Sequence, residues 1–208
     1  MALEDGLEGG KRSTLPGYVG IKFEARCRDD AQPRECAELH PLFREQGRRL
    51  GRYGMAPANG GNMSVRLPRG FAITSSGCPL DDIEADDIVW VEACDPDREK
   101  VHYAGPRLPS SESILHHMIY EARADARCVI HAHDPVATAT PSARFVPESA
   151  REEPYGTVAL ARIAIETFRR DRRVILLRNH GYVATGGSLE AVANTIVELH
   201  LRLLEGSR

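Results

Sequence analysis

A short apolar run that ends in two alternating histidines is the feature that most constrains how this chain folds. Cys128–Ile130 has the composition of a buried strand, and His131-Ala132-His133 follows it directly. Residues i and i+2 of a strand point to the same side, so the two imidazoles are expected to stand next to each other at the strand end. One metal ion can bind both rings there. Two partly exposed loop histidines are the alternative.

A third histidine follows another apolar run in the same way. Val174–Leu177 has the pattern of a buried strand, and His180-Gly181 comes two residues later. Gly181 leaves space beside the imidazole for a ligand. Two strand ends of one sheet can converge on a single ion, and three histidine ligands with open positions are typical of catalytic zinc. The alternative for His180 is a turn residue whose ring is satisfied locally.

A carboxylate stands at the expected start of a helix. Pro109-Ser110-Ser111-Glu112 precedes apolar residues that recur at helical spacing, which predicts a helix with a serine N-cap. The free N–H groups and the positive dipole end of such a start can hold a phosphate or carboxylate, with Glu112 beside it. On this motif alone, a plain helix cap is the favoured interpretation.

Two glycine-containing turns are further candidate anion sites. Gly60–Asn62 and Thr74–Gly77 combine glycine with short hydroxyl or amide side chains, which is the composition of an anion-binding nest. Ordinary turn chemistry explains each of them equally well. Neither turn identifies a ligand by itself.

The remaining patterns predict strands grouped early in the chain and helices packed around them. Alternation and turn signals predict strands at residues 62–67, 71–74, 88–92, 101–103, 128–130, 174–177 and 182–185. Helical spacing predicts helices at residues 34–51, 155–168 and 188–204 and one that starts near Glu112, with a kink at Pro41 and an irregular segment at 137–143. These elements predict an α+β or α/β fold, a three-layer α/β/α domain around a largely antiparallel sheet.

Composition narrows the class of protein. The 208 residues are 42% hydrophobic and 27% charged, which suffices for one globular core without disulfides. The formal net charge of -3, with no basic face in the sequence, argues against nucleic acid as the main partner. No apolar run is long enough to span a membrane, so no membrane partner is expected.

The N-terminus and the cysteines indicate where the protein works. Residues 1–30 are expected to form a mobile N-terminal arm and residues 31–208 the single domain, and the first residues lack the apolar core of a secretory signal. The five cysteines are an odd number without a C-x-x-C pair, which suits a reducing compartment. A cytoplasmic location is therefore expected.

Read in order, five motifs resemble the class II aldolase/adducin family of zinc-dependent sugar-phosphate aldolases, which includes fuculose-phosphate aldolase. The resemblance runs from about residue 35 to the end of the sequence. The motifs are Gly61–Arg66, Ile73–Gly77, Pro109–Glu112 with His116 one turn later, His131–Pro135 and Leu176–Gly181. The order and spacing of the five together are far more specific than any one of them.

The resemblance implies roles for individual residues. It implies that His131, His133 and His180 bind zinc and that Glu112 is the acid/base. The residues that it implies for phosphate binding are Asn62, Ser76, Gly77, Ser110 and Ser111. It gives His116 a supporting position beside the site, with core packing as the alternative. It also implies a homotetramer with active sites at subunit interfaces, to which the C-terminal helix and residues 137–154 are expected to contribute.

The match weakens between the second and third histidines, where the usual central segment is shortened. In the family, a tyrosine from this region of a neighbouring subunit serves as proton donor. Tyr155 is the candidate for that role by position only. Other residues of the segment are candidates for lining a pocket of different shape: Arg144, Glu148 and Arg151.

The resemblance implies a metal-dependent lyase that cleaves a ketose 1-phosphate to dihydroxyacetone phosphate and an aldehyde by retro-aldol chemistry. A divalent ion would stabilise the developing charge as a Lewis acid while Glu112 moves the proton. Zinc is expected, and imidazole ligands also accept manganese, cobalt or iron. One alternative is a decarboxylase or dehydratase of a related phosphorylated or carboxylated hydroxy-ketone on the same metal site. Another is a non-catalytic, adducin-like interaction module.

Overall fold

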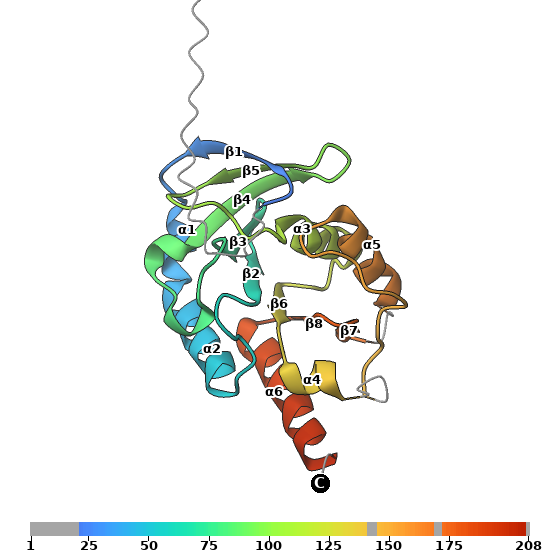
Figure 1. Ribbon diagram of the computed structural model, residues 1–208. Coiled ribbons are helices and arrows are strands. Elements are labelled where there is room, and N and C mark those ends of the chain that lie inside the picture. Colours follow the sequence, from blue (N-terminus) through green and yellow to red (C-terminus); the bar gives the residue numbers. More distant parts are fainter. Residues whose placement is uncertain (1–20, 141–144, 169–171, 207–208) are drawn as a thin grey trace, which may run out of the picture.

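A single mixed sheet forms the centre of the molecule in the computed structural model, which describes residues 21–140, 145–168 and 172–206. The order of the strands across the sheet is β1-β5-β4-β3-β2-β6-β8-β7 (Figure 1). The strands are β1 Glu24–Asp29, β2 Asn62–Arg66, β3 Phe71–Thr74, β4 Ile88–Asp95, β5 Lys100–Ala104, β6 Cys128–Ala132, β7 Val174–Leu177 and β8 Gly181–Gly186. The pairs are antiparallel except for β1 and β5, so the predicted largely antiparallel sheet is confirmed.

Helices cover both faces of this sheet. They are α1 Arg34–Glu38, α2 His40–Arg52, α3 Ser113–Ala122, α4 Pro135–Ala139, α5 Val158–Thr167 and α6 Leu189–Gly206. The helices α3 and α5 lie on one face, and α2 and α6 lie on the other (Figure 1). The three-layer α/β/α prediction is therefore confirmed. Within the described ranges, no helix is both long and apolar enough to cross a membrane.

Strand alternation decides which side chains enter which layer. In β2, Met63 belongs to the core under α2 and α6, whereas its neighbour Ser64 hydrogen-bonds to His116 of α3. In β6, Ile130 belongs to the first core and Val129 to the core under α3 and α5. Because side chains alternate along a strand, the polar positions of β2 are directed at a helix and not at water.

The strand β1 was not expected. It lies inside the predicted N-terminal arm of residues 1–30 and pairs with β5, so the boundary placed at residue 31 falls within the folded unit. Its sequence Glu24–Asp29 is charged and mostly exposed, because β1 is the edge strand, and it therefore lacks the apolar alternation that marks a strand. Residues 1–20 of the predicted arm lie outside the described residues.

Two other segments differ from the sequence prediction in detail. The expected helix at 34–51 is divided at Leu39 into α1 and α2, and Pro41 lies in the first turn of α2, where its missing N–H is tolerated. The segment 137–143 was expected to be irregular, yet its first residues belong to α4. Asp134 caps α4 by accepting a hydrogen bond from the N–H of Val136. Residues 141–144 lie outside the described residues.

Candidate metal centre and active site

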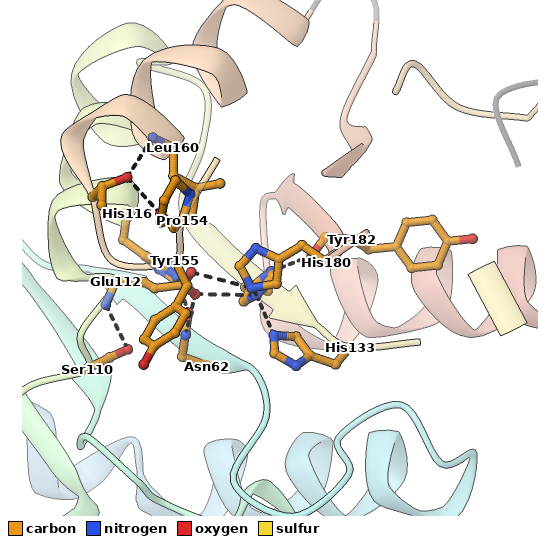
Figure 2. Close-up of polar contacts among 12 residues, drawn as sticks. Asn62, Ser110, Glu112, His116, His133, Pro154, Tyr155, Leu160, His180 and Tyr182 are labelled. Atoms are coloured by element: carbon orange, nitrogen blue, oxygen red, sulfur yellow. Dashed lines mark hydrogen bonds and ion pairs between the residues drawn. The ribbon is translucent and has the colours of Figure 1, made fainter. Parts of the chain in front are cut away.

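The three histidines singled out in the sequence come together at one edge of the sheet. His131 and His133 lie at the end of β6, and His180 lies in the turn between β7 and β8. Since β6 pairs directly with β8, these ends are adjacent, with His131 opposite Val183. The Nε2 atom of His131 is 2.8 Å from Nε2 of His133 and 3.2 Å from Nε2 of His180 (Figure 2).

The nitrogen chemistry of this cluster fits a cation. The Nδ1 atom of His131 lies 2.9 Å from the carbonyl oxygen of Tyr182, which only accepts hydrogen bonds, so Nδ1 carries the proton and Nε2 presents a lone pair. Burial, with His180 close by, lowers the pKa of His133 to about 4, and burial also lowers the pKa of His131. The ligand atoms of His131, His133 and His180 lie within 4.8 Å of one another, an arrangement suited to a divalent metal ion.

Two glycines allow the backbone and the rings to approach this closely. A Cβ atom on Gly60 would lie 2.7 Å from Nδ1 of His133. A Cβ atom on Gly181 would lie 2.3 Å from the carbonyl oxygen of Ala132. The glycines beside the histidine motifs therefore have a steric reason that the sequence indicated for Gly181 alone.

Glu112 faces the three imidazoles from the start of α3 (Figure 2). Its Oε2 atom accepts a 2.8 Å hydrogen bond from Nδ2 of Asn62 and lies 3.3 Å from Nε2 of His131. Its Oε1 atom is 3.8 Å from Nε2 of His180 and is buried without a hydrogen-bond partner among the described residues. A buried carboxylate oxygen without a donor is unusual in a folded protein and marks a position for a proton, a ligand or an ion.

The predicted serine N-cap is wrong. Helix α3 begins at Ser113, and Glu112 itself occupies the N-cap position without a capping hydrogen bond from its side chain. Ser110 instead closes a turn before the helix, where its Oγ accepts from the N–H of Glu112 at 3.2 Å. This turn leaves the Glu112 carboxylate directed at the histidines and not at the helix backbone.

The predicted phosphate-binding residues lie in adjacent turns. The N–H of Ser110 donates to the carbonyl of Thr74 at 3.1 Å, and the N–H of Ser76 donates to the carbonyl of Leu108 at 2.8 Å. These bonds place the turn that contains Gly77, whose φ is +77°, beside the start of α3. That these residues bind phosphate stays a prediction.

Asn62 has a different environment from the rest of this predicted set. Its amide nitrogen donates to Glu112, and its oxygen lies 2.5 Å from Nε2 of His116. The amide nitrogen carries two hydrogens, so one remains for a substrate oxygen.

Asp87 supports the turn at Thr74–Gly77 and was missed in the sequence. It is 1% exposed, and its Oδ1 atom accepts from Oγ of Ser75 at 2.6 Å and from Arg107 at 2.5 Å. In the sequence it is one of several acidic residues in a polar stretch, so no pattern set it apart.

The candidates for a second acid/base and for the pocket lining lie in different surroundings. The segment that carries Tyr155 lies beside the start of α3, because the neighbouring Gly156 packs against Ser111: a Cβ atom there would lie 3.0 Å from the Ser111 carbonyl. Lys22 donates to the Tyr155 carbonyl at 2.7 Å.

The pocket-lining candidates form ion pairs with nearby residues where the structure describes them. Glu148 pairs with Arg178 at 2.9 Å and Arg151 pairs with Glu153 at 2.6 Å, while Arg144 lies outside the described residues.

Comparison with known proteins agrees with this geometry. Residues 43–203 match the family model for the Class II Aldolase and Adducin N-terminal domain. A 5-methylthioribulose-1-phosphate/5-deoxyribulose-1-phosphate aldolase of Rhodospirillum rubrum is 31% identical over 170 residues, which are 74% of this chain and 74% of that protein. A methylthioribulose-1-phosphate dehydratase of Gluconacetobacter diazotrophicus is 44% identical over 93 residues, 44% of this chain and 43% of that protein.

A solved structure has the same fold. An L-fuculose 1-phosphate aldolase superimposes with a TM-score of 0.65 and 29% identity, over 84% of this chain and 85% of that one. The residues that match the family model, 43–203, include the three histidines and Glu112. The family-model match, which extends over most of the chain, and this shared fold give the same assignment. The chain belongs to the class II aldolase and adducin family.

Proposed function

We propose that the protein is a metal-dependent lyase that cleaves a ketose 1-phosphate to dihydroxyacetone phosphate and an aldehyde. The observation that carries the proposal is the convergence of three imidazoles with the carboxylate of Glu112, whose Oε1 is buried without a hydrogen-bond partner within the described ranges. The relative of Rhodospirillum rubrum, named as an aldolase of two ribulose 1-phosphates, supports both the reaction and the substrate class.

His131, His133 and His180 would hold the metal, with zinc as the first choice and manganese, cobalt or iron as alternatives. When bound, such an ion supplies Lewis-acid stabilisation of the negative charge that develops on the substrate oxygens. The carbonyl of Tyr182 keeps the His131 ring in the tautomer that leaves Nε2 free to bind.

Glu112 would carry the proton of the reaction. Cleavage leaves the carbon next to the carbonyl with the electron pair of the broken bond, and this carbon must gain a proton. Oε1 of Glu112 is unpaired and faces the histidines, so it is suited to deliver that proton, while Asn62 holds Oε2. The hydroxyl on the aldehyde half must lose its proton to a second group. Our candidate is Tyr155, whose phenolate would accept this proton in cleavage and whose phenol would be the proton donor of the reverse condensation.

The turns at Thr74–Gly77 and Ser110–Ser111 would bind the substrate phosphate. Their serine hydroxyls and the nearby start of α3 are the kinds of donor that phosphate requires, while the N–H groups of Ser76 and Ser110 already donate to backbone carbonyls. Binding energy from the phosphate would orient the reacting bond towards Glu112.

We extend the proposal to a homotetramer with active sites at subunit interfaces. Leu201 and Leu204 on α6 are 41% and 42% exposed, which favours a partner for the end of this helix. Light scattering coupled to gel filtration measures the mass directly, and a monomer would contradict this part of the proposal.

A dehydratase is the second candidate function. The 44% identity over 93 residues to a protein named as a methylthioribulose-1-phosphate dehydratase favours it. The same metal site and Glu112 would serve, but the proton would be removed next to the carbonyl and a hydroxyl would leave as water. The carbon skeleton would then stay intact and no dihydroxyacetone phosphate would form.

The first test is turnover of the metal-loaded, full-length protein with a panel of ketose 1-phosphates. The panel contains 5-deoxyribulose, 5-methylthioribulose and fuculose 1-phosphates, and dihydroxyacetone phosphate is detected by a coupled assay. We expect release of dihydroxyacetone phosphate that a chelator abolishes. Consumption of substrate without this product would favour the dehydratase, and no consumption with metal bound would contradict both enzymatic candidates.

Variants assign the roles within the site. His131→Ala is expected to lose the metal and the activity, whereas His102→Ala, at an exposed histidine of β5, should keep both. Glu112→Gln is expected to keep the metal and lose about 100-fold or more of kcat, because the amide cannot carry the proton. Turnover of Glu112→Gln near the wild-type rate would show that another group moves the proton.

A further inference from the structure

A buried row of polar side chains runs from Glu112 along the interface of α3 with β2. Each member is at most 6% exposed and hydrogen-bonds to the next. We call it the α3–β2 polar row, and its members in order are Tyr120, Ser64, His116, Asn62 and Glu112. The distances along it are 2.7 Å from the Tyr120 hydroxyl to Oγ of Ser64, 2.6 Å from there to Nδ1 of His116, 2.5 Å from Nε2 of His116 to Oδ1 of Asn62, and 2.8 Å from Nδ2 of Asn62 to Oε2 of Glu112.

The chemistry of the groups gives every bond of the row one direction. Asn62 donates to Glu112 through its nitrogen, so its oxygen is the atom that meets His116 and must accept from Nε2. Burial lowers the pKa of His116 to about 4, so the ring is neutral at pH 7 and its Nδ1 accepts from the Ser64 hydroxyl. Ser64 then has only a lone pair to offer Tyr120, which donates.

The orientation of the Asn62 amide determines which group faces the Glu112 carboxylate. If the Asn62 amide were rotated by 180°, its oxygen would face the carboxylate and its nitrogen would face a ring N–H. One contact would then join two acceptors and the other two donors. With its proton on Nε2, His116 therefore favours the same amide orientation as the carboxylate does, the one in which Oε2 of Glu112 receives a donor. The other carboxylate oxygen, Oε1, is left directed at the histidines without a hydrogen-bond partner among the described residues.

The row is suited to orient side chains and not to transfer protons. A proton wire needs groups that both gain and lose a proton, and the amide of Asn62 stands between His116 and Glu112. Burial also raises the pKa of the Tyr120 hydroxyl, which keeps its proton in place. A row of fixed polarity stores no charge and has one lowest-energy arrangement.

We infer that His116 is a positioning residue that, with Ser64 and Tyr120 behind it, holds the Asn62 amide in the one orientation that fixes Oε2 of Glu112 and leaves Oε1 for the substrate proton. This inference rests on the proposed acid/base role of Glu112. It goes beyond that role because it assigns a function to three side chains that contact neither the histidine cluster nor Glu112 directly.

The test compares two substitutions at His116. In His116→Gln, the side-chain amide can still donate to Asn62, whereas His116→Leu has similar bulk and no donor. We expect His116→Leu to lose about 100-fold in kcat with KM and metal content nearly unchanged, and His116→Gln to recover about tenfold of that loss. His117→Leu, at the next position of α3 and outside the row, is the matched control. Equal losses in both His116 variants, in kcat and KM alike, would show a role in packing only and overturn the inference.

A double-mutant cycle tests whether His116 acts through Glu112. In the Glu112→Gln background, His116→Leu should lower kcat by less than about threefold, because the group that it orients is gone. Losses that multiply would contradict the inference. If Glu112→Gln alone keeps the wild-type rate, the proposed acid/base role of Glu112 fails, and the inference that rests on it is overturned as well.

A spectroscopic measurement distinguishes failure of the proposed function from failure of the inference about His116, because it does not depend on enzymatic activity. Nitrogen NMR of the full-length protein labelled at histidine should find His116 at pH 7 as the neutral ring with its proton on Nε2. Tyr120→Phe should shift the Nδ1 resonance of that ring, because it removes the donor to Ser64. A charged ring, or a proton on Nδ1, would overturn the inference whatever the enzyme turns over.

Discussion

At the residue scale, the close approach of the turn before β2 to the His133 imidazole sets the geometry of the candidate metal site. The turn before β2 passes so close to the His133 imidazole that only a hydrogen atom fits at Gly60. A methyl group there would meet Nδ1 and Cγ of His133 at 2.7 and 3.2 Å and would push the ring away from its partners. Metal affinity should therefore be sensitive to a residue that binds nothing itself.

The substitution Gly60→Ala is expected to weaken metal binding about 10- to 100-fold, the range seen when a group that orients a metal ligand is changed. Competition with a metal-binding dye measures this affinity. Gly187→Ala is the control, since a Cβ atom at Gly187 would have no neighbour within 4 Å. Equal affinities of the two variants would mean that the His133 ring does not set the strength of the site.

The buried His116 also predicts how stability depends on pH. Its pKa is about 4 in the folded protein against about 6.5 when exposed, so below pH 6.5 the unfolded chain takes up a proton that the folded chain does not. This contribution to stability is complete above pH 6.5 and is lost as the pH falls towards 4. Between pH 7 and pH 5 the loss should be about 2 kcal/mol.

Urea unfolding of the wild type and of His116→Gln at the two pH values isolates that contribution. The variant should lose about 2 kcal/mol less than the wild type over this interval, because glutamine does not titrate. Parallel pH dependences would show that His116 is already protonated in the folded state at pH 5.

At the scale of elements, the contact between α3 and β2 is what the sequence left undetermined. The alternation of β2 was evident, and its polar positions at Asn62, Ser64 and Arg66 would normally be assigned to solvent. They meet α3 instead, through pairs of residues more than 50 positions apart in the chain. Sequence patterns describe neighbours within an element, so they do not specify a polar contact between distant elements.

Other features were predictable because they are local or carried by motifs. The apolar runs identified β6 and β7, and the histidines that follow them were expected to converge, as they do. The glycine and serine turns were located as well. The edge strand β1 and the supporting Asp87 had no local signal, since both are charged segments whose partners lie far along the chain.

Arg66 anchors the end of α3 to β2. Its guanidinium donates to the backbone carbonyls of Tyr120, Arg123 and Ala126 at 2.5, 3.0 and 2.9 Å. The substitution Arg66→Ala leaves these carbonyls without that donor and should lower the free energy of unfolding by about 2 kcal/mol. Arg34→Ala, which removes an exposed ion pair in α1, should change it by less than about 0.5 kcal/mol.

Chemical denaturation of both variants checks this prediction. Because Arg66 lies on the same strand as Asn62, activity should fall in Arg66→Ala together with stability. A stability of Arg66→Ala equal to that of Arg34→Ala would show that water replaces the guanidinium at the carbonyls without loss.

At the scale of the whole molecule, the three histidines connect parts of the sheet that are distant in sequence. His131 and His133 lie at the end of β6, while His180 belongs to the β7–β8 turn. An ion that binds all three histidines therefore binds the folded state and not the unfolded chain, and so it stabilises the fold. With free metal at about 1,000 times the dissociation constant, this linkage contributes about 4 kcal/mol. Chelation should therefore lower the melting temperature by about 10 °C.

Thermal unfolding with and without a chelator, followed by return of the metal, measures this shift. His131→Ala should melt at the same temperature in both conditions. A wild-type protein indifferent to chelator and to added metal would contradict the three-histidine site.

The direct pairing of β6 with β8 has an evolutionary consequence. Because His131 and His133 lie at the end of β6 and His180 lies in the turn between β7 and β8, these paired strands hold the three histidines, and the chain from α4 to α5 can change in length and sequence with less effect on them. That same stretch passes the start of α3 at Gly156, the residue after Tyr155. Sequence change in this stretch can therefore alter what lies beside the start of α3 while the positions of the three histidines persist.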